Sequence, residues 1–256
     1  MRRTLVVGLT CVVVILMTGA GMAVRPQNPA HIMEVKDKTL RASYVGAADV
    51  CYQAGFFQPA GERYVSGFGM LRSLKLVRDI EDDLDHEEIM FHLAYQKATQ
   101  LTDQLALGIN LSYKNRWLDQ RQLSSLWGID VGGTLAVEPD AALGITIENI
   151  VVFGEVSQRP LLVGVEWTQL LSERVYVTLG VTDLLNRQKE KNLWGELEWS
   201  LAPSLKLRTG GMHGLIIPRN GYDVSLLADL GKWDLGLGYI HDGKEAGLMV
   251  EFGMPF

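Results

Sequence analysis

The chain has 256 residues, a formal net charge of −6 and a mean hydropathy of +0.08. The charge is mildly acidic and no basic block is present, which excludes nucleic acid as an expected partner. The mean hydropathy is too low for a helical membrane protein, whose spanning segments are almost wholly apolar. The length suits a single main domain.

The first 23 residues have the parts of a secretory signal peptide. A positive start, Arg2-Arg3, precedes an apolar run over residues 4–17 and then small residues up to Ala23. We expect cleavage after Ala23. The alternative, a membrane anchor, needs an apolar run of roughly 20 residues. Cleavage would leave Cys51 as the single cysteine, so an intramolecular disulfide is excluded.

The rest of the chain repeats one pattern of about ten alternating residues followed by a turn. Alternation with a period of two predicts strands with one apolar face and one small or polar face. We predict an all-β fold, a transmembrane antiparallel up-and-down β-barrel over 38–256, after a short periplasmic segment at 24–37. It has about 14 strands, with 12 as the alternative. The predicted strand cores are 38–47, 50–57, 62–71, 88–97, 104–113, 126–137, 141–151, 159–168, 174–183, 192–201, 204–213, 221–230, 233–241 and 245–255.

The connections alternate between short and long, as they do in outer-membrane barrels. Tight turns are predicted at 101–103, 138–140, 170–173, 202–204 and 230–232. Longer charged loops are predicted at 71–87, 114–125, 152–158, 184–191 and 214–220. Short turns lie on the periplasmic side of such barrels, and both chain ends then lie there too. An even number of strands follows.

The last strand ends on an aromatic residue at the carboxyl terminus. Phe252, Met254 and Phe256 share its apolar face, and this strand is expected to pair with the first so that no edge is left in lipid. The terminal Phe256 resembles the signal that the barrel-assembly machinery reads. Aromatic side chains near strand ends predict an interfacial girdle. Its members are Tyr113, Trp167, Trp199, Trp233, Tyr239 and Phe256.

The opposite faces predict a charged lumen. The lumen-facing charged residues are Asp130, Glu148, Glu166, Glu196, Glu198, Lys206, Arg208, Asp234 and Glu251. A turn at 201–203 places Glu198 opposite Lys206, and Glu196 opposite Arg208. One interpretation is a constriction that selects solutes; the other, which these complementary pairs favour, is a structural ladder that neutralises the interior. The acidic excess would favour cations over anions in any open pore.

Asn28-Pro29-Ala30 precedes the first strand, and a hairpin-like segment covers residues 128–149. With the strand number, these features resemble the FadL superfamily of outer-membrane barrels, which includes long-chain fatty-acid transporters and the PorV and PorQ barrels of secretion. The resemblance implies a hydrophobic-ligand path. Only about fourteen residues, 24–37, separate the cleavage site from strand one, which leaves little material for an amino-terminal hatch. The pairs Gly132-Gly133 and Gly210-Gly211 within strands indicate bends or tight packing.

Signals for catalysis and for metal binding are weak. The run 79–88 is rich in carboxylates but lacks the glycine and spacing of an EF-hand loop, so it is interpreted as a solvated loop and no metal or cofactor is expected. His213 and His241 lie at outer strand ends, where a lipid-cleaving barrel would place a base. Ser225 and Ser112 are the remote nucleophile candidates.

Three functions remain after the sequence is considered. The first is a non-enzymatic outer-membrane channel or transporter for small, hydrophobic or polar solutes. The second is a non-conducting scaffold of the PorV type that serves a secretion apparatus. The third is a lipid-modifying enzyme. Under the first two, the expected partners are outer-membrane lipid, the barrel-assembly machinery and either a small solute or a secretion apparatus.

Overall fold

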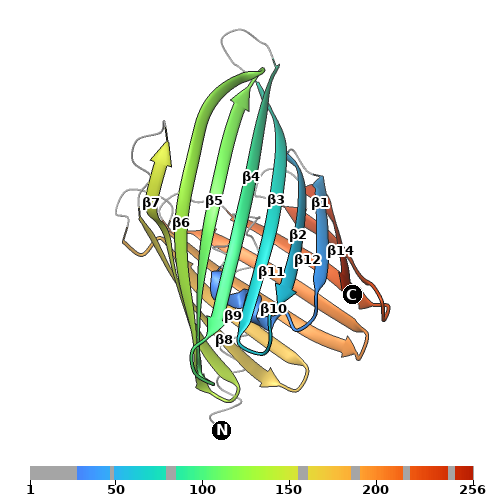
Figure 1. Ribbon diagram of the computed structural model, residues 1–256. Coiled ribbons are helices and arrows are strands. Elements are labelled where there is room, and N and C mark those ends of the chain that lie inside the picture. Colours follow the sequence, from blue (N-terminus) through green and yellow to red (C-terminus); the bar gives the residue numbers. More distant parts are fainter. Residues whose placement is uncertain are drawn as a thin grey trace.

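The computed structural model describes residues 28–46, 49–78, 85–154, 161–185, 191–215, 220–241 and 246–255. They form one closed, antiparallel barrel of 14 strands and a short 3-10 helix (Figure 1). The elements are η1 (Pro29–Glu34), β1 (Thr39–Gly46), β2 (Asp49–Pro59), β3 (Tyr64–Arg78), β4 (Asp85–Gln100), β5 (Leu105–Leu118), β6 (Arg121–Glu138), β7 (Ala141–Gly154), β8 (Leu162–Ser172), β9 (Val175–Thr182), β10 (Asn192–Ala202), β11 (Leu205–Gly214), β12 (Asn220–Asp229), β13 (Asp234–His241) and β14 (Ala246–Pro255). The expected signal peptide, part of the run 79–88 and Phe256 lie outside the described residues.

The barrel closes between its first and last strands. Each strand pairs with its neighbours in the chain, and β1 pairs with β14 so that Leu40 lies opposite Met254 and Ala42 opposite Phe252. Closure leaves no free sheet edge along this seam, which is what a strand structure in hydrocarbon requires. The prediction of 14 strands is confirmed, and the described residues include no helix of the length and apolarity that crossing a bilayer demands.

Side chains alternate between the outside and the inside of the wall. On β12 and β13 the outward Leu226 and Leu237 are directly paired, and they are 44% and 57% exposed. Their inward neighbours Ser225 and Gly238 are also paired. The outward rows present mainly aliphatic side chains, because a period of two keeps each kind of residue on one face. This arrangement suits a wall that contacts hydrocarbon on one side and water on the other.

The wall has two heights. Strands β3 to β7 contain 14 to 18 residues, whereas β8 to β14 contain 8 to 11. A strand crosses the hydrocarbon of a bilayer with about 9–11 residues. The longer strands therefore rise past the others at the end opposite the tight turns, as the tall green and cyan ribbons show (Figure 1). We call this part the tall wall.

The tall wall corrects one prediction. The segment 114–125 is not a long loop, because β5 and β6 continue through it and are joined by Asp119 and Gln120 alone, with φ of 44° and 68°. Two successive positive φ values are those of a type I′ hairpin turn. A strand that extends beyond the hydrocarbon needs no apolar face. Its sequence can therefore be charged throughout, and such a strand resembles a loop when only the sequence is considered. The predicted loops 71–87 and 152–158 are shortened in the same way by β3, β4 and β7.

The short connections agree with the predictions. Four of the five tight turns are two-residue reversals or close to it, at Pro139-Asp140, Glu173-Arg174, Pro203-Ser204 and Gly231-Lys232. The fifth is slightly longer and is closed by a hydrogen bond from Leu101 N to Leu105 O at 2.8 Å. All five lie at the same end of the barrel. Each joins an even-numbered strand to the next odd-numbered strand, and all even-numbered strands run toward that end.

The two faces of β12 provide a direct test of the inside and the outside. Leu226→Lys places an ammonium on the outward face and should lower the free energy of unfolding in lipid, by up to about 2–4 kcal/mol at mid-bilayer depth. Leu227→Lys is the matched control, because Leu227 faces the lumen beside Glu251. Urea unfolding in lipid vesicles measures both variants. An equal loss of stability in the two would contradict the assigned faces.

Candidate functional site

The helix η1 lies inside the barrel, in its lower part as drawn in Figure 1. It packs on the inner faces of β3, β4, β5 and β6. The sequence left little material for a hatch, yet Asn28–Val35 are enough for a short one. We call these eight residues the plug. The Asn-Pro-Ala element at its start is therefore part of the interior of the barrel.

Asn28 fixes the start of the plug to the wall. Its side-chain Oδ1 accepts a hydrogen bond from Ala30 N at 3.0 Å and so caps η1, while Pro29 occupies a first-turn position that needs no N–H. The amide Nδ2 donates to Gly133 O at 3.1 Å and to Glu166 Oε1 at 3.3 Å. Asn28 is only 2% exposed, so these partners replace the water it has lost.

Two glycines of the wall make room for the plug. Gly108 on β5 and Gly132 on β6 are directly paired and face the plug. A Cβ on Gly108 would lie 2.3 Å from the carbonyl carbon of Pro29, and one on Gly132 would lie 2.1 Å from Asn28 Oδ1. A larger residue at Gly108 would displace the plug backbone, and one at Gly132 would displace the Asn28 side chain and the Pro29 ring. The tight packing expected at Gly132 is therefore present, and the packed partner is the plug.

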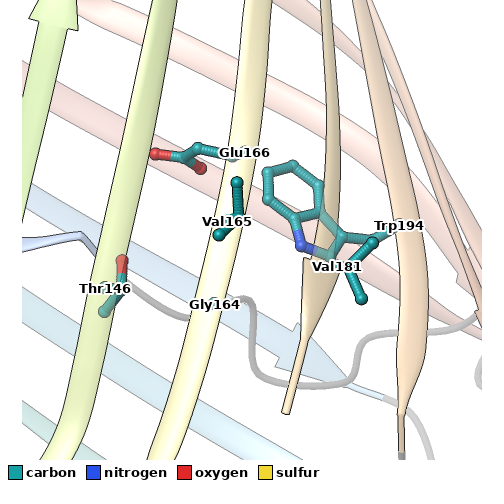
Figure 2. A pocket seen from close by; sticks show the side chains of 6 residues that line it. All are labelled: Thr146, Gly164, Val165, Glu166, Val181 and Trp194. Carbon is teal, nitrogen blue, oxygen red and sulfur yellow. The ribbon is translucent and has the colours of Figure 1, made fainter. Parts of the chain in front are cut away.

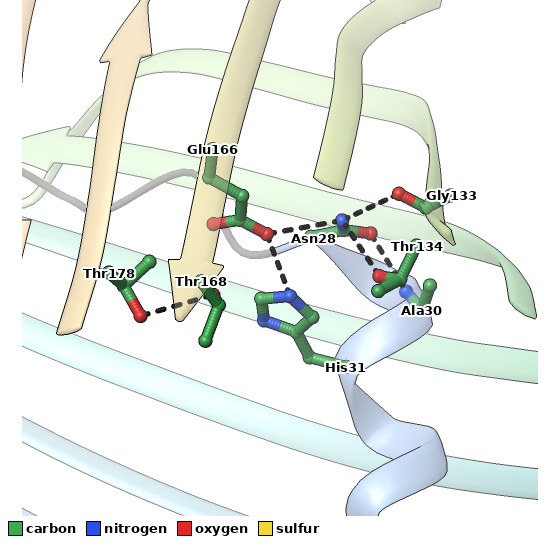
Figure 3. A network of polar contacts seen from close by, with 8 residues as sticks. All are labelled: Asn28, Ala30, His31, Gly133, Thr134, Glu166, Thr168 and Thr178. Carbon is green, nitrogen blue, oxygen red and sulfur yellow. Dashed lines mark hydrogen bonds and ion pairs between the residues drawn. The ribbon is translucent and has the colours of Figure 1, made fainter. Parts of the chain in front are cut away.

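Glu166 on β8 contacts two polar side chains of the plug, Asn28 and His31 (Figure 3). Its Oε1 lies 2.7 Å from His31 Nε2 and also accepts from Asn28. The Glu166 side chain is 6% exposed, and it lies over Gly144, where a Cβ would come within 2.4 Å of Oε1. A buried carboxylate is costly unless it is hydrogen-bonded or paired. Attachment of the plug satisfies this acid, so the plug and Glu166 stabilise each other.

The second half of the plug is held by apolar contacts. Ile32 and Val35 are each 8% exposed and pack with Val65 of β3 and Ala98 of β4. Met33 and Phe57 extend this cluster as partly buried neighbours. Burying one such aliphatic side chain contributes roughly 1.5–3 kcal/mol. The plug is thus polar where it meets β6 and β8, and apolar where it meets β3 and β4.

A small recess adjoins Glu166 on the side away from the plug. It is lined by Thr146, Gly164, Val165, Glu166, Val181 and Trp194 (Figure 2). The Trp194 indole lies over Gly180, where a Cβ would be 2.3 Å from Cε2, and it packs with Met212 in a buried apolar pair. The recess has room for about one water molecule. It is therefore no ready-made pocket for an aromatic solute.

The predicted charged residues of β10, β11 and β14 face the lumen, and they form two ion pairs. Lys206 Nζ donates to Glu198 Oε1 at 2.7 Å, although Ser200, and not Glu198 as predicted, lies opposite Lys206. Arg208 donates to a residue that the sequence did not predict as its partner. Its Nη2 donates to Glu251 Oε1 at 2.6 Å.

The register of the β10–β11 hairpin explains the different partner of Arg208. A bulge at Ser200/Ala202 shifts the pairing, so Glu198 rather than Glu196 lies opposite Arg208. The guanidinium reaches β14 because Gly236 and Gly238 on the intervening β13 carry no side chain. Asp234, also inward, begins β13 and lies against Gly253 of β14.

The other predicted acids lie where β7 changes its pairing. Ile129 of β6 is opposite Val151, but Val131 is opposite Ile147, so a bulge at residues 148–150 faces Asp130. Asp130 Oδ1 accepts from Asn149 N at 2.8 Å, and Oδ2 accepts from Asn110 Nδ2 at 2.8 Å. Glu148 is the last residue of β7 that pairs with β8. Above it, within the described residues, β7 stays paired with β6 alone.

The aromatic residues of the predicted girdle lie on the outward face. Trp167, Trp199 and Trp233 are 38%, 46% and 50% exposed at the tight-turn end of the barrel. Tyr113 and Tyr239 lie toward the other end, where Tyr113 packs with Trp127 at 4.9 Å between ring centroids. Phe252 and Met254 face outward along the closing seam. Two aromatic levels on the outward face are typical of barrels that cross a membrane.

The candidate catalytic residues are not brought together. His213 lies on the outward face, with Nδ1 2.6 Å from Asn220 Oδ1, and His241 lies on the same face. Ser225 and Ser112 face inward and are 1% and 2% exposed. The barrel wall separates these histidines from these serines, so the four residues form no nucleophile–base pair.

Several residues of the site carried no recognisable signal in the sequence. His31, Ile32 and Val35 belong to a segment too short for a periodicity, and Trp194 is a large aromatic on a face expected to be small or polar. Gly108 alternates with outward residues in the same way as Ala106, Asn110 and Ser112, and nothing local distinguishes it from these small or polar neighbours. Its pairing with Gly132 becomes visible only once the strand register is known.

The architecture is shared with solved transporters. No protein-family model and no curated protein sequence matches the chain. The toluene transporter TodX of Pseudomonas putida is similar with a TM-score of 0.73 and 11% identity, over 94% of this chain and 96% of that chain. The monoaromatic hydrocarbon channel CymD gives 0.69 and 12% identity, over 93% and 94%. The toluene transporter TbuX of Ralstonia pickettii gives 0.63 and 13% identity, over 93% and 96%.

These transporters are outer-membrane barrels of the FadL family. The resemblance that the sequence suggested is therefore confirmed at the level of the fold. At such low identities the similarity establishes the fold, and any shared solute is a separate question.

The plug lies against Gly108 and Gly132, which we call its glycine seat, and this contact generates the first prediction of this site. Gly108→Ala should loosen the plug, since its Cβ would overlap the Pro29 backbone. Gly69→Ala is the control, because that inward Cβ would meet only Ala54 O at 3.7 Å. Maleimide labelling of Ile32→Cys in a Cys51→Ser background reports the exposure of the plug. Faster labelling is expected for Gly108→Ala alone, and equal rates in both variants would contradict the seat.

The polar attachment of the plug to Glu166 generates the second prediction. Glu166→Ala removes the acceptor shared by Asn28 and His31, and a hydrogen bond to a charged group is worth about 1.5–3 kcal/mol. Labelling at position 32 should accelerate by at least about tenfold. Glu148→Ala is the matched control, because it removes an inward carboxylate of β7 and keeps the Glu166 acceptor that Asn28 and His31 share. Unchanged labelling in Glu166→Ala would show that apolar packing alone holds the plug.

Proposed function

We propose that the chain is an outer-membrane channel for small hydrophobic solutes, whose apolar path is closed at rest by the plug. The observation that carries the proposal is a lumen with a short, separately seated segment inside it. The fold, shared along nearly the whole chain with proteins described as toluene transporters and monoaromatic hydrocarbon channels, supports the same conclusion. A wall that only anchored the protein would need no seated segment in its interior.

The proposed path runs along the apolar half of the plug. Ile32, Met33 and Val35 face Val65 and the neighbouring inner wall, so an apolar solute entering here exchanges water contacts for aliphatic ones. Movement of the plug away from Gly108 and Gly132 opens this apolar path. The plug and the wall can separate without unfolding of any strand, because the plug contributes no residue to the sheet.

A side exit is the proposed end of this path. Supporting it, β7 ceases to pair with β8 above Glu148, and the bulge at 148–150 turns the strand at that level. Ile147 and Val151, which flank the bulge on the outward face, are apolar, as a path into lipid requires. The alternative to a side exit is diffusion straight along the lumen, and a solute-flux experiment distinguishes the two.

Delivery to the outer membrane is part of the same proposal. Residues 1–23 are proposed to act as a cleaved signal peptide in a bacterium with two membranes, and the strand ending in Phe252, Met254 and Phe256 is proposed to be read by the barrel-assembly machinery. The outward aromatic levels support contact with outer-membrane lipid.

One observation favours a second candidate, a surface scaffold that serves a secretion apparatus. The tall wall extends β6 to 18 residues, more than crossing a membrane needs. Shortening the β5–β6 hairpin by joining Asn115 to Ser125 through a two-residue turn removes its tip. A scaffold would lose its complex in native electrophoresis, whereas a channel would keep its solute flux.

The proposed channel predicts hydrocarbon uptake. Cells expressing the chain should take up toluene supplied at micromolar concentration several-fold faster than cells with an empty vector. Gly108→Ala should raise the rate further because its plug is loosened, while Gly69→Ala should match the parent chain. Heat-modifiable migration in electrophoresis verifies that each barrel is folded. Folded barrels that take up toluene no faster than the vector control would overturn the proposal.

A further inference from the structure

The plug occupies only one side of the lumen. It packs on β3 to β6 and bonds to β8, and no such packing on β10 to β14 occurs among the described residues. Inward side chains on the uncovered side remain accessible: Lys206 is 47% exposed, Glu251 30% and Arg208 24%, against 6% for Glu166 beside the plug. Because these side chains face the lumen, their exposure indicates water inside the barrel along this side.

The uncovered side carries a group of charged inward residues, which we call the charged wall. It consists of the inward residues Arg41, Glu196, Glu198, Lys206, Arg208, Asp223, Asp234 and Glu251 of β1 and β10 to β14. Arg41, Lys206 and Asp234 lie near the tight-turn ends of their strands, and Glu196 and Asp223 lie deeper. Carboxylates outnumber the cationic side chains in this set, so the wall has a net negative charge.

Arg208 lies at the centre of the charged wall. It donates to Glu251, and its charge also interacts with Glu196 and Asp223. The side chain passes over β13, where Gly236 leaves space that Leu227 and Glu251 border. One guanidinium therefore offsets carboxylates from three other strands. Its removal would take away the cation bonded to Glu251, whose charge also acts on Glu196 and Asp223.

We propose that the charged wall forms a second route through the barrel, a water-filled passage for small hydrated cations that runs beside the seated plug. Rings and rows of charged side chains select ions by sign, and the net negative charge here favours cations. Arg208 limits this selectivity because it neutralises the centre of the passage. This route needs no movement of the plug, so it is independent of the proposed hydrocarbon path.

Planar bilayers containing the purified full chain test this route. With a potassium chloride gradient, we expect stepwise currents and a reversal potential that indicates potassium over chloride. Arg208→Gln should raise the permeability ratio several-fold. Lys97→Gln is the matched control: it removes the same charge from an exposed side chain on the outward face of β4, and it should leave the ratio unchanged.

A second variant covers the case in which Arg208→Gln fails to fold. Glu196→Gln keeps the Arg208–Glu251 pair and should lower the cation preference. The preference should also weaken between 0.1 M and 1 M salt, where the screening length falls from about 10 Å to about 3 Å. A silent parent chain, or equal shifts in Arg208→Gln and Lys97→Gln, would overturn the proposal. Silence would leave toluene uptake unaffected, so failure of this route is distinguishable from failure of the hydrocarbon channel.

Discussion

Closure of the sheet is the constraint on which the other features depend. The pairing of β1 with β14, from Thr39 opposite Pro255 to Gly46 opposite Leu248, satisfies the backbone groups of both end strands. It also fixes the register around the whole barrel, and register assigns every side chain to one face. The plug seat and the charged wall exist because Gly108, Gly132 and Arg208 all have inward parity. A slip of one residue at the seam would move such groups into lipid.

A closed barrel limits the space inside, and glycines in the wall leave room there for the plug and for the Glu166 side chain. A glycine within a strand costs roughly 0.5–1 kcal/mol relative to alanine. At Gly108 and Gly132 this cost is offset by burial of Asn28 and Pro29, and at Gly144 by the position of the Glu166 carboxylate. The plug is short because the wall is indented to receive it. Eight residues then make both a polar and an apolar attachment, which a segment lying on a smooth wall would need more chain to achieve.

The features that follow from local alternation could be predicted from the sequence. The strand number, the tight turns and the inward parity of residues such as Glu198 and Lys206 depend on a period of two within single strands. The partner of Arg208 could not be predicted, because it depends on a bulge at Ser200/Ala202 and on glycines two strands away. The plug seat is equally non-local: Gly108 and Asn28 are distant in sequence, and only the closed barrel brings them together.

The two sides of the lumen place opposite demands on a solute. A hydrated ion loses far more free energy than a hydrocarbon does when its water is removed, because an unpaired charge in an apolar environment is strongly disfavoured. It therefore follows the charged wall, where exposed carboxylates and water remain. A hydrocarbon gains most where water is excluded, beside Ile32 and Val35. Placing the plug against β3 to β6 separates these environments, so one barrel can close the apolar path while the polar one stays wet. Under this arrangement the position of the plug, rather than the width of the barrel, decides which class of solute crosses.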